Sequence, residues 1–385
     1  MLKMVRRWTC LEWRNEEESS VNCIFILSIK EELPDRYQVW VKLAKNLPTL
    51  VEEGQFREEA EQLPELSIDE LQGYKEQRLA HLALSVITMG YVWQDRNVLP
   101  RNIAVPFWNL SEKLGLPPIM VYADCVLANW KKKDPLGNMD TLFAFPGGDC
   151  SKGFFLVSLL VEKAAASAMK VIPDIFEAVK KKNSESLKES LQSVASSVYE
   201  AYKTFQLVHV YLFSLFCFSW KNCSLLPKGL IYEGVSEIPK EFAGGSAAQS
   251  SIMQCFDALL GIQHTTENDE KSAKYLEEMR NYMPSPHKIF LEAVASHSSV
   301  RDFVSSSDDI QLKKAYNECV KALVHIRNYH LQVVNKYIIS PSSKQDSEKG
   351  QKSSDDEVKG TGGTNLLIFL RSVRDTTKRA LLEES

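Results

Sequence analysis

One histidine of this 385-residue chain lies among the apolar side chains of a predicted helix, a position that suits either a metal ligand or a core residue. Apolar spacing predicts a helix over residues 312–339, and His330 lies at the centre of its apolar stripe. The side chains within about 40° of its direction are Cys319, Leu323, Ile326, Val334 and Tyr337. One imidazole among hydrocarbon side chains is what a proximal haem ligand requires. A core histidine bonded to a carbonyl is the alternative, and this helix alone favours it.

A charged side chain lies close to that histidine. Arg327 is one turn earlier and about 60° around the helix, at the edge of the stripe. A guanidinium is always charged, so it needs a carboxylate partner if it is buried. Asp257, within the apolar stretch SIMQCFDALLGI, is a candidate for that partner.

Two aromatic segments and two glycine turns complete the candidates for chemistry. Phe154 and Phe155 begin a predicted helix, with Ser158 one turn later on the same side. Such rings usually pack in a core, but they could equally wall a pocket for a flat ligand, and the stretch 121–130 is similarly ambiguous. The turns at 244–247 and 360–364 expose backbone N–H groups that suit carboxylates or phosphates. Neither turn matches a dinucleotide fingerprint or a P-loop.

Composition excludes several classes of protein. With 46 Lys plus Arg against 50 Asp plus Glu, the net charge is -4, which argues against nucleic-acid coating and polybasic membrane binding. None of the eight cysteines forms a CxxC pair, so the sequence contains no zinc-ribbon motif. A reducing compartment is the simplest interpretation. The apolar runs at 22–29 and 205–220 are shorter than a bilayer span. We therefore expect a cytoplasmic protein without membrane segments.

Helical periodicity dominates the elements that must position these residues, which predicts an all-α fold. Residues 75–93 carry one apolar stripe, and the four prolines of 98–120 predict a connector between domains. Further helices are predicted over 119–132, 153–171, 185–218, 249–262, 268–283, 312–339 and 365–383. Residues 340–359 are polar and of low complexity, which predicts a mobile loop, either a lid or a plain linker.

At these residues the chain resembles the indoleamine 2,3-dioxygenase family. The similar blocks are LPRNIAVP (99–106), LPPIMVYADCVLANWKKKDP (116–135), GDCSKGFFLVSLLVEKAAASA (148–168), PKEFAGGSAAQSSIMQCFDALLGIQ (239–263), RNYMPSPHKIFLE (280–292), HIRNYHLQVVNKYI (325–338) and KGTGGTNLLIFLRSVRDTT (359–377). They run in the family's order and cover most of the chain from about residue 33 onward.

The resemblance implies a small helical domain over 1–105, whose first ~30 residues are atypical, and a large helical haem domain over 106–385. It implies one haem b, and O₂-dependent opening of the indole C2–C3 bond of L-tryptophan or related indoleamines. The product is N-formylkynurenine. The protein is then expected to be a monomer.

The resemblance also implies roles for individual residues. His330 matches the proximal iron ligand, and Asp257 with Arg327 resembles the ion pair behind it. The residues that match the distal and substrate pocket are Tyr122, Cys125, Val126, Phe154, Phe155, Ser158, Gly245, Ser246, Ala247 and Thr361. Because indole is electron-rich, no obligatory catalytic acid or base is expected, and Ser158 is assigned a contact role.

One segment differs from the family pattern. The family has an Arg before a tryptophan, in a pattern like LRIYLSGW, and that Arg pairs with the substrate carboxylate. Here residues 210–220 read VYLFSLFCFSW without an Arg. Losing such a bidentate partner typically weakens binding by ~1.5–3 kcal/mol.

Two other hypotheses follow from this difference. In the first, the chain turns over poorly and acts in signalling. The segment LIYEGV (230–235) fits a phosphotyrosine motif, in which Tyr232 would recruit an SH2 domain, although an ordinary packed tyrosine is the simpler interpretation. In the second, the sequence is misassembled around 205–220 and this region does not fold.

Overall fold

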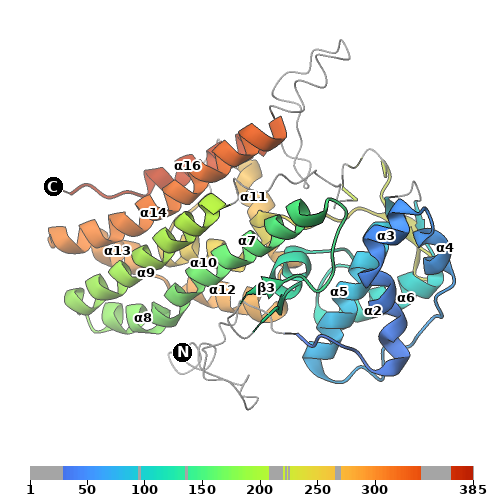
Figure 1. Cartoon of the computed structure of the whole chain (residues 1–385). Helices are drawn as coiled ribbons and strands as arrows, with labels where there is room; N and C mark the ends of the chain where they lie inside the picture. The colour runs from blue at the N-terminus through green and yellow to red at the C-terminus, as the bar shows by residue number, and fades with distance from the viewer. Residues whose placement is uncertain are drawn as a thin grey trace, which may run out of the picture.

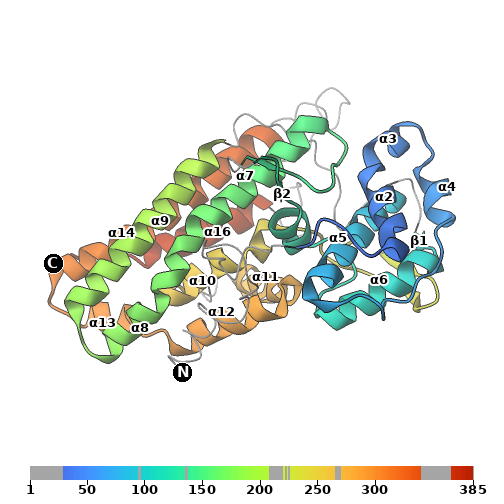
Figure 2. The ribbon, with the colours of Figure 1, turned by 60° about the horizontal axis from the view of Figure 1, so that its bottom comes forward.

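The computed structural model of the chain describes residues 29–93, 97–134, 138–207, 220–221, 223, 226–264, 270–339 and 366–384. Helices α2 to α6 gather on one side, while α8, α9, α13, α14 and α16 form the other (Figures 1 and 2). The chain is predominantly helical, which confirms the expected all-α class. The unusual first residues and the predicted loop at 340–359 lie outside the described residues.

The side formed by α2 to α6 is built around α5. The bounds of these helices are Gln38–Lys45 (α2), Leu47–Glu52 (α3), Phe56–Glu61 (α4), Gly73–Val92 (α5) and Arg101–Leu114 (α6), after a short 3₁₀ turn, η1, at Asp35–Tyr37. Helix α5 is buried on all sides, and even Arg78 and His81 are enclosed. The single apolar stripe predicted at 75–93 was therefore too narrow, because α2, α3, α4 and α6 all pack against this helix.

The other side is a helical bundle that contains helices of 19, 22 and 25 residues. Its elements are α7 (Gly148–Ala166), η3 (Ser167–Val171), α8 (Ile172–Lys180), α9 (Ser184–Phe205), α10 (Ser251–Leu259), α11 (Glu270–Met279), η6 (Arg280–Tyr282), α12 (Ser285–His297), α13 (Val300–Ser305), α14 (Ile310–Val334), the π-helix η7 (Asn335–Ile339) and α16 (Leu366–Arg379). Helix α9 packs along α7 and α14, and α16 packs along α14. Asp309 begins α14 as an N-cap, since its carboxylate accepts the N–H groups of Gln311 and Leu312.

The strands are short and serve to join distant segments. Strands β1 (Val98–Leu99), β4 (Leu230–Tyr232) and β5 (Ser236–Lys240) form one sheet, and β2 (Lys131–Lys132) pairs with β3 (Met139–Asp140). Strand β4 runs parallel to β1 and antiparallel to β5. A π-helix, η2 (Ala123–Ala128), and a 3₁₀ turn, η5 (Ala247–Gln249), carry residues of the predicted site.

Two apolar cores meet along α7. The first includes residues of α2, α5, α6, η2 and β4, and it takes Phe155 and Leu159 of α7. The second fills the bundle of α8, α9, α10, α12 and α14, and it takes Val161 and Ala165 of α7. The two-domain division stays a prediction, and its boundary at residues 105 and 106 falls inside α6.

The predicted connector over 98–120 was wrong, because most of it is helix α6 despite Pro106 in its interior. An interior proline costs a helix about 3 kcal/mol. Burial of Ile103, Phe107 and Leu110 contributes about 1.5–3 kcal/mol for each side chain, which outweighs that cost. Gly115, with φ of 66°, then ends the helix in a left-handed conformation.

The helix predicted over 119–132 is instead the six-residue π-helix η2. The predicted helix at 185–218 begins as α9, which ends at Phe205, and residues 208–219 lie outside the described part of the chain. Helices α2, α3, α4, α8, α12 and α13 were not predicted separately.

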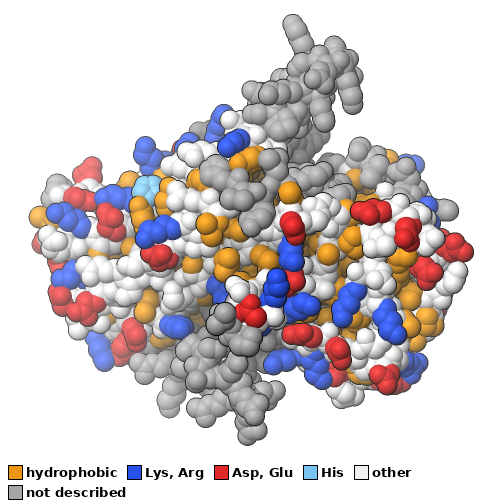
Figure 3. Space-filling model, in the orientation of Figure 1, with side chains coloured by type: hydrophobic (Ala, Val, Ile, Leu, Met, Phe, Trp, Pro, Cys, Tyr) orange, Lys and Arg blue, Asp and Glu red, His pale blue; other side chains and the backbone are white. Residues whose placement is uncertain are grey.

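The surface carries both signs of charge. Figure 3 shows Lys and Arg interspersed with Asp and Glu among apolar side chains on the visible face, in line with the net charge of -4. Within the described ranges, no helix has both the length and the apolar character that a bilayer crossing demands. The cytoplasmic location stays a prediction.

Candidate functional site

Helix α14 positions His330 as the sequence pattern predicted. Four members of its stripe, Cys319, Leu323, Ile326 and Val334, are buried, and Tyr337 is half-buried. The His330 ring is itself half-buried, and its centroid lies 5.9 Å from that of Phe205 on α9. Desolvation lowers the pKa of His330 to about 4, so the imidazole is neutral at pH 7. A neutral ring offers a nitrogen lone pair to a metal.

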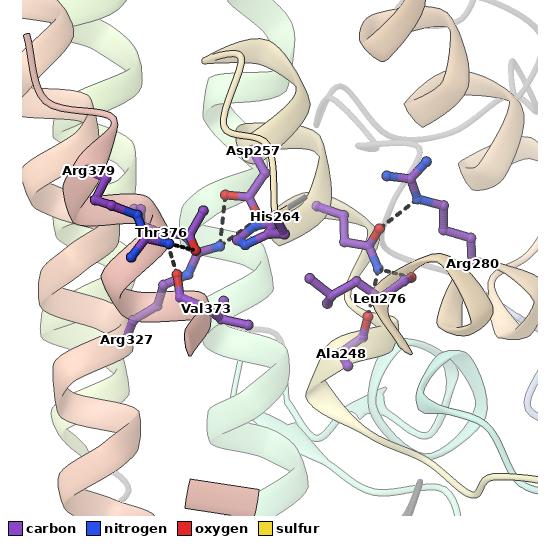
Figure 4. Close-up of polar contacts among 11 residues, drawn as sticks. Ala248, Asp257, His264, Leu276, Arg280, Arg327, Val373, Thr376 and Arg379 are labelled. Carbon is purple, nitrogen blue, oxygen red and sulfur yellow. Dashed lines mark hydrogen bonds and ion pairs between the residues drawn. The ribbon is translucent and has the colours of Figure 1, made fainter. Parts of the chain in front are cut away.

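The ion pair predicted between Asp257 and Arg327 joins α10 to α14 (Figure 4). Nη2 of Arg327 donates to both carboxylate oxygens of Asp257, at 2.8 and 2.7 Å. His264 Nε2 lies 3.0 Å from Asp257 Oδ2, and Arg327 Nη1 donates to Thr377 on α16. Burial alone would raise the pKa of Asp257, but Arg327 and His264 hold it below its ordinary value. The carboxylate thus fixes α14 against α10 in ionised form.

The sequence pattern found Arg327 and Asp257 but missed His264. The sequence gives little indication of His264, because this residue lies beyond the end of α10. It reaches Asp257 only because the chain reverses there. Gly261, with φ of 65°, allows that reversal.

The start of α7 presents two of its three predicted residues on one face. Phe154 and Ser158 are both half-buried, whereas Phe155 is buried against Phe145 with ring centroids 5.2 Å apart. The Phe154 and Phe155 rings meet edge to face at 5.5 Å. Ser158 Oγ donates to the Phe154 carbonyl at 2.8 Å. The hydroxyl proton is therefore engaged within the helix.

The segment of Tyr122, Cys125 and Val126 is buried and adjoins the glycine turn. A Cβ atom added to Gly245 would lie 3.2 Å from Cys125 Sγ and 3.5 Å from the Tyr122 nitrogen. The turn thus lies directly against the segment of Tyr122, Cys125 and Val126, which we call the wall. A side chain at position 245 would push the two apart.

Two glutamines that the sequence analysis missed hold this turn. Gln249 Oε1 accepts the Tyr122 N–H at 2.8 Å, and its amide nitrogen donates to the Gly244 carbonyl at 2.7 Å. The amide of Gln254 donates to the carbonyls of Ala248 and Leu276, and its oxygen accepts from Arg280 (Figure 4). Side-chain amides thereby replace the regular backbone ladder that an irregular segment lacks.

The remaining predicted residues fall into three groups. Ser246 is half-buried and accepts the Ala248 N–H, while Ala247 is exposed. Thr361 lies outside the described residues. Tyr232 is fully buried in β4, where its hydroxyl donates to the Pro118 carbonyl at 2.6 Å and accepts from Trp220 Nε1 at 3.0 Å. This burial favours the packed-tyrosine interpretation and gives a kinase no access to Tyr232 in the folded chain.

The donor set fits a prosthetic group held by one protein nitrogen. No three His, Cys, Asp or Glu side chains gather as metal ligands in the described part of the chain. His330, in contrast, is neutral and makes no hydrogen bond within the described ranges. Haem needs only this single axial donor and apolar cover for its ring. On this all-helical fold, His330 therefore meets the requirement of a group that is held by one axial nitrogen.

The chain belongs to the indoleamine 2,3-dioxygenase family, whose model matches residues 25–380. It is 53% identical over 371 residues to indoleamine 2,3-dioxygenase 1 of Mus musculus, covering 91% of both chains. It is 42% identical over 374 residues to indoleamine 2,3-dioxygenase 2 of Homo sapiens, again with 91% of both covered. A protein of Haliotis madaka named myoglobin is 36% identical over 366 residues, covering 91% of this chain and 94% of its own.

Proposed function

We propose that this protein is a haem b dioxygenase that opens the indole C2–C3 bond of L-tryptophan with O₂ to give N-formylkynurenine. The observation that carries the proposal is His330, a neutral, half-buried imidazole that is fixed by α14 within a chain of this family. Related indoleamines are further candidate substrates. A monomer in the cytoplasm stays our expectation.

Each part of the site has a physical task in this reaction. His330 would hold the iron, and the Asp257–Arg327 pair would keep α14 at a fixed distance from α10. Haem, when bound, supplies the iron that activates O₂, and both oxygen atoms end in the product, so no net reductant is consumed. Phe154 would fit the flat indole and exclude water from it.

No side chain of the site is needed as an acid or a base. Indole is electron-rich at C2 and C3. The protein therefore does not need to remove the indole N–H proton before oxygen adds to this bond. Ser158 already donates its proton to the Phe154 carbonyl, which suits a wall residue better than a proton donor. The turn at 244–246 would receive the amino-acid part of the substrate through its backbone.

The segment without the family's arginine bears on substrate affinity. In the pattern LRIYLSGW the arginine comes six residues before the tryptophan, which corresponds to Ser214 before Trp220. Residue 214 lies outside the described ranges. We expect Ser214→Arg to lower KM for L-tryptophan by roughly 10- to 100-fold, the range of a charge-assisted bidentate bond. A KM unchanged by this substitution would show that the carboxylate is bound elsewhere.

The test is a comparison of three proteins. The wild type, His330→Ala and His325→Ala are purified with haem, reduced without O₂, and then given O₂ and L-tryptophan. His325 is the matched control, since it lies on the same helix but is exposed. We expect a Soret band and formylkynurenine from the wild type and from His325→Ala, and neither from His330→Ala.

Two other results would change the proposal. A wild type with a Soret band, a stable O₂ complex and no product would place it functionally beside the relative named myoglobin. A folded wild type that takes up no haem would reject His330 as the ligand and the dioxygenase with it.

A further inference from the structure

A buried glutamate joins three separate elements of the proposed site. Glu162 lies on α7, one turn beyond Ser158, and its Oε1 accepts two hydroxyl groups. Tyr122 Oη donates at 2.9 Å, and Ser250 Oγ donates at 2.6 Å. Tyr122 belongs to the wall before η2, and Ser250 is the N-cap residue of α10. A single oxygen atom therefore connects α7, the wall and α10.

The connection continues to the glycine turn. The Tyr122 N–H donates to Gln249, which donates in turn to the Gly244 carbonyl. Gly245 adjoins Tyr122 and Cys125 so closely that a Cβ atom would lie 3.2 Å from the Cys125 sulfur. Both ends of Tyr122 are thus held, the hydroxyl by Glu162 and the amide by Gln249. A displacement of Tyr122 would therefore carry the turn with it.

The surroundings of Glu162 make this connection unusual. The side chain is 2% exposed, and within the described residues its Oε2 has no hydrogen-bond partner. Burial raises the pKa of Glu162 to about 7, although the hydroxyls of Ser250 and Tyr122 oppose that shift. These two neutral groups, from α10 and from the wall, are the groups that face the carboxyl, and no ionised side chain of the described chain contributes.

A structural core would not be expected to contain such a group. A buried carboxyl with one oxygen unbonded and no counter-charge among the described residues destabilises the fold. A leucine of similar volume would fill the space without that cost. The sequence analysis assigned Tyr122 to the pocket but did not single out Glu162.

We propose that Glu162 is a positioning residue, which aligns the Tyr122–Cys125 wall with the turn at 244–246 by accepting the hydroxyls of Tyr122 and Ser250. The substrate-binding part of this inference rests on the proposed function, because the wall and the turn are where tryptophan would bind. The alignment itself is a property of the chain with or without turnover.

The experiment compares wild type, Glu162→Leu, Glu162→Gln and the surface control Glu189→Leu, all purified with haem. Leucine removes the acceptor, glutamine keeps a carbonyl oxygen in its place, and Glu189 is exposed on α9. The first readout is hydrogen–deuterium exchange in peptides that cover 119–128 and 243–250. We expect Glu162→Leu to speed exchange in both peptides by about 10-fold, and the other two variants to match the wild type.

The second readout is kinetic. Glu162→Leu should raise KM for L-tryptophan about 10-fold, with kcat within about twofold, because the lost alignment affects binding more than the reaction. Glutamine should restore KM. A loss of stability alone would reduce the amount of active protein and leave KM unchanged.

The third readout is the melting temperature against pH. A carboxyl with a raised folded pKa stabilises the fold below its ordinary value of 4.5 and loses that contribution as pH rises to about 7. The melting temperature of the wild type should therefore fall progressively below that of Glu162→Gln between these two pH values. Above the higher value, the two curves of melting temperature should run parallel.

The outcomes separate this inference from the proposed function. Unchanged exchange in Glu162→Leu overturns the alignment, whatever the activity, and faster exchange with unchanged KM overturns its role in binding. A wild type without turnover defeats the proposed function, while exchange still decides the alignment. If Glu162→Leu does not fold, Tyr122→Phe and Ser250→Ala, which each remove one donor, are expected to speed exchange in the same two peptides, and unchanged exchange in both overturns the inference.

Discussion

The chain contains the same trio of side chains twice, in two different surroundings. Asp124 bridges Arg78 and His81 between α5 and η2, with Oδ1 at 2.8 Å from Arg78 Nη2 and 3.0 Å from His81 Nδ1. Asp257 bridges Arg327 and His264 between α10 and α14. In both trios the aspartate pKa is held below its ordinary value by its arginine and histidine, although burial opposes this.

The two trios differ in how completely water is excluded. The side chains of Asp124, Arg78 and His81 are 0% exposed, whereas those of Asp257, His264 and Arg327 are 9–14% exposed. Nε and Nη1 of Arg78 also lack hydrogen-bond partners within the described residues. The first trio therefore depends wholly on its internal balance of charge, and the second is partly screened by solvent.

The two trios also support different segments of the molecule. The Asp124 trio supports the wall that begins at Tyr122, since Asp124 Oδ2 also accepts the Val121 N–H at 3.1 Å. The Asp257 trio supports the helix that carries His330. The trios thus hold different parts of the proposed site, and substitutions in them should have different consequences.

The largest effect is expected from Asp124→Asn. Neutralising this side chain leaves the guanidinium of Arg78 buried without a counter-charge, which costs about 3–5 kcal/mol for a pair of this kind. The free energy of unfolding in urea measures it. The double substitution Asp124→Asn with Arg78→Met is the control, and it should recover part of the loss. A single-variant loss below about 1 kcal/mol would contradict the assigned balance of charge.

A smaller loss of stability is expected from Asp257→Asn, about 1–3 kcal/mol, because solvent screens the charge that remains on Arg327. This variant should instead release haem faster than the wild type, since α14 is no longer fixed to α10. Transfer of haem to an excess of an apo-globin measures the rate. If Asp124→Asn releases haem faster than Asp257→Asn at equal stability, the division of tasks between the trios is wrong.

The smallest effect at neutral pH is expected from His264→Gln. Asp257 keeps both bonds from Arg327, and a glutamine amide can replace the donor, so the loss should be about 1 kcal/mol or less. Urea unfolding beside Asp257→Asn checks this order. A loss equal to that of Asp257→Asn would make His264 the principal partner of the carboxylate.

A last prediction concerns the pH dependence of stability. A carboxylate with a lowered folded pKa stabilises the fold above its ordinary value, and this contribution disappears as pH falls through the folded pKa. The wild type should therefore lose stability below about pH 4 more steeply than Asp257→Asn, which has no such proton to take up. Parallel acid-unfolding curves would show that folding leaves the pKa of Asp257 unchanged, which would contradict its stabilisation by Arg327 and His264.

The sequence analysis identified two members of the second trio and none of the first. His330, Arg327 and the apolar stripe lie on one helix, where a period of 3.6 residues defines their directions. Asp257 could be predicted because a buried arginine demands a carboxylate. The sequence analysis did not identify the Asp124 trio, because nothing in the pattern of α5 shows that other helices surround it on every side.

The other misses have the same origin. Helix α6 was missed because the low helix propensity of Pro106 is visible in the local sequence. The tertiary packing that offsets it is not. Glu162 has a local signal, as the one acid in the apolar run LVSLLVEKAA, but its partners Tyr122 and Ser250 are 40 and 88 residues away. Contacts over such separations follow from the tertiary fold rather than from local periodicity.

The most direct test of the account is a turnover of the haem-loaded wild type under oxygen-18 gas, with the mass of the product as readout. The account predicts that both oxygen atoms added to the indole ring carry the label, at C2 and at C3, and that His330→Ala gives no labelled product. A product with one labelled atom, or a ferrous haem protein that binds O₂ and leaves tryptophan intact, would contradict it.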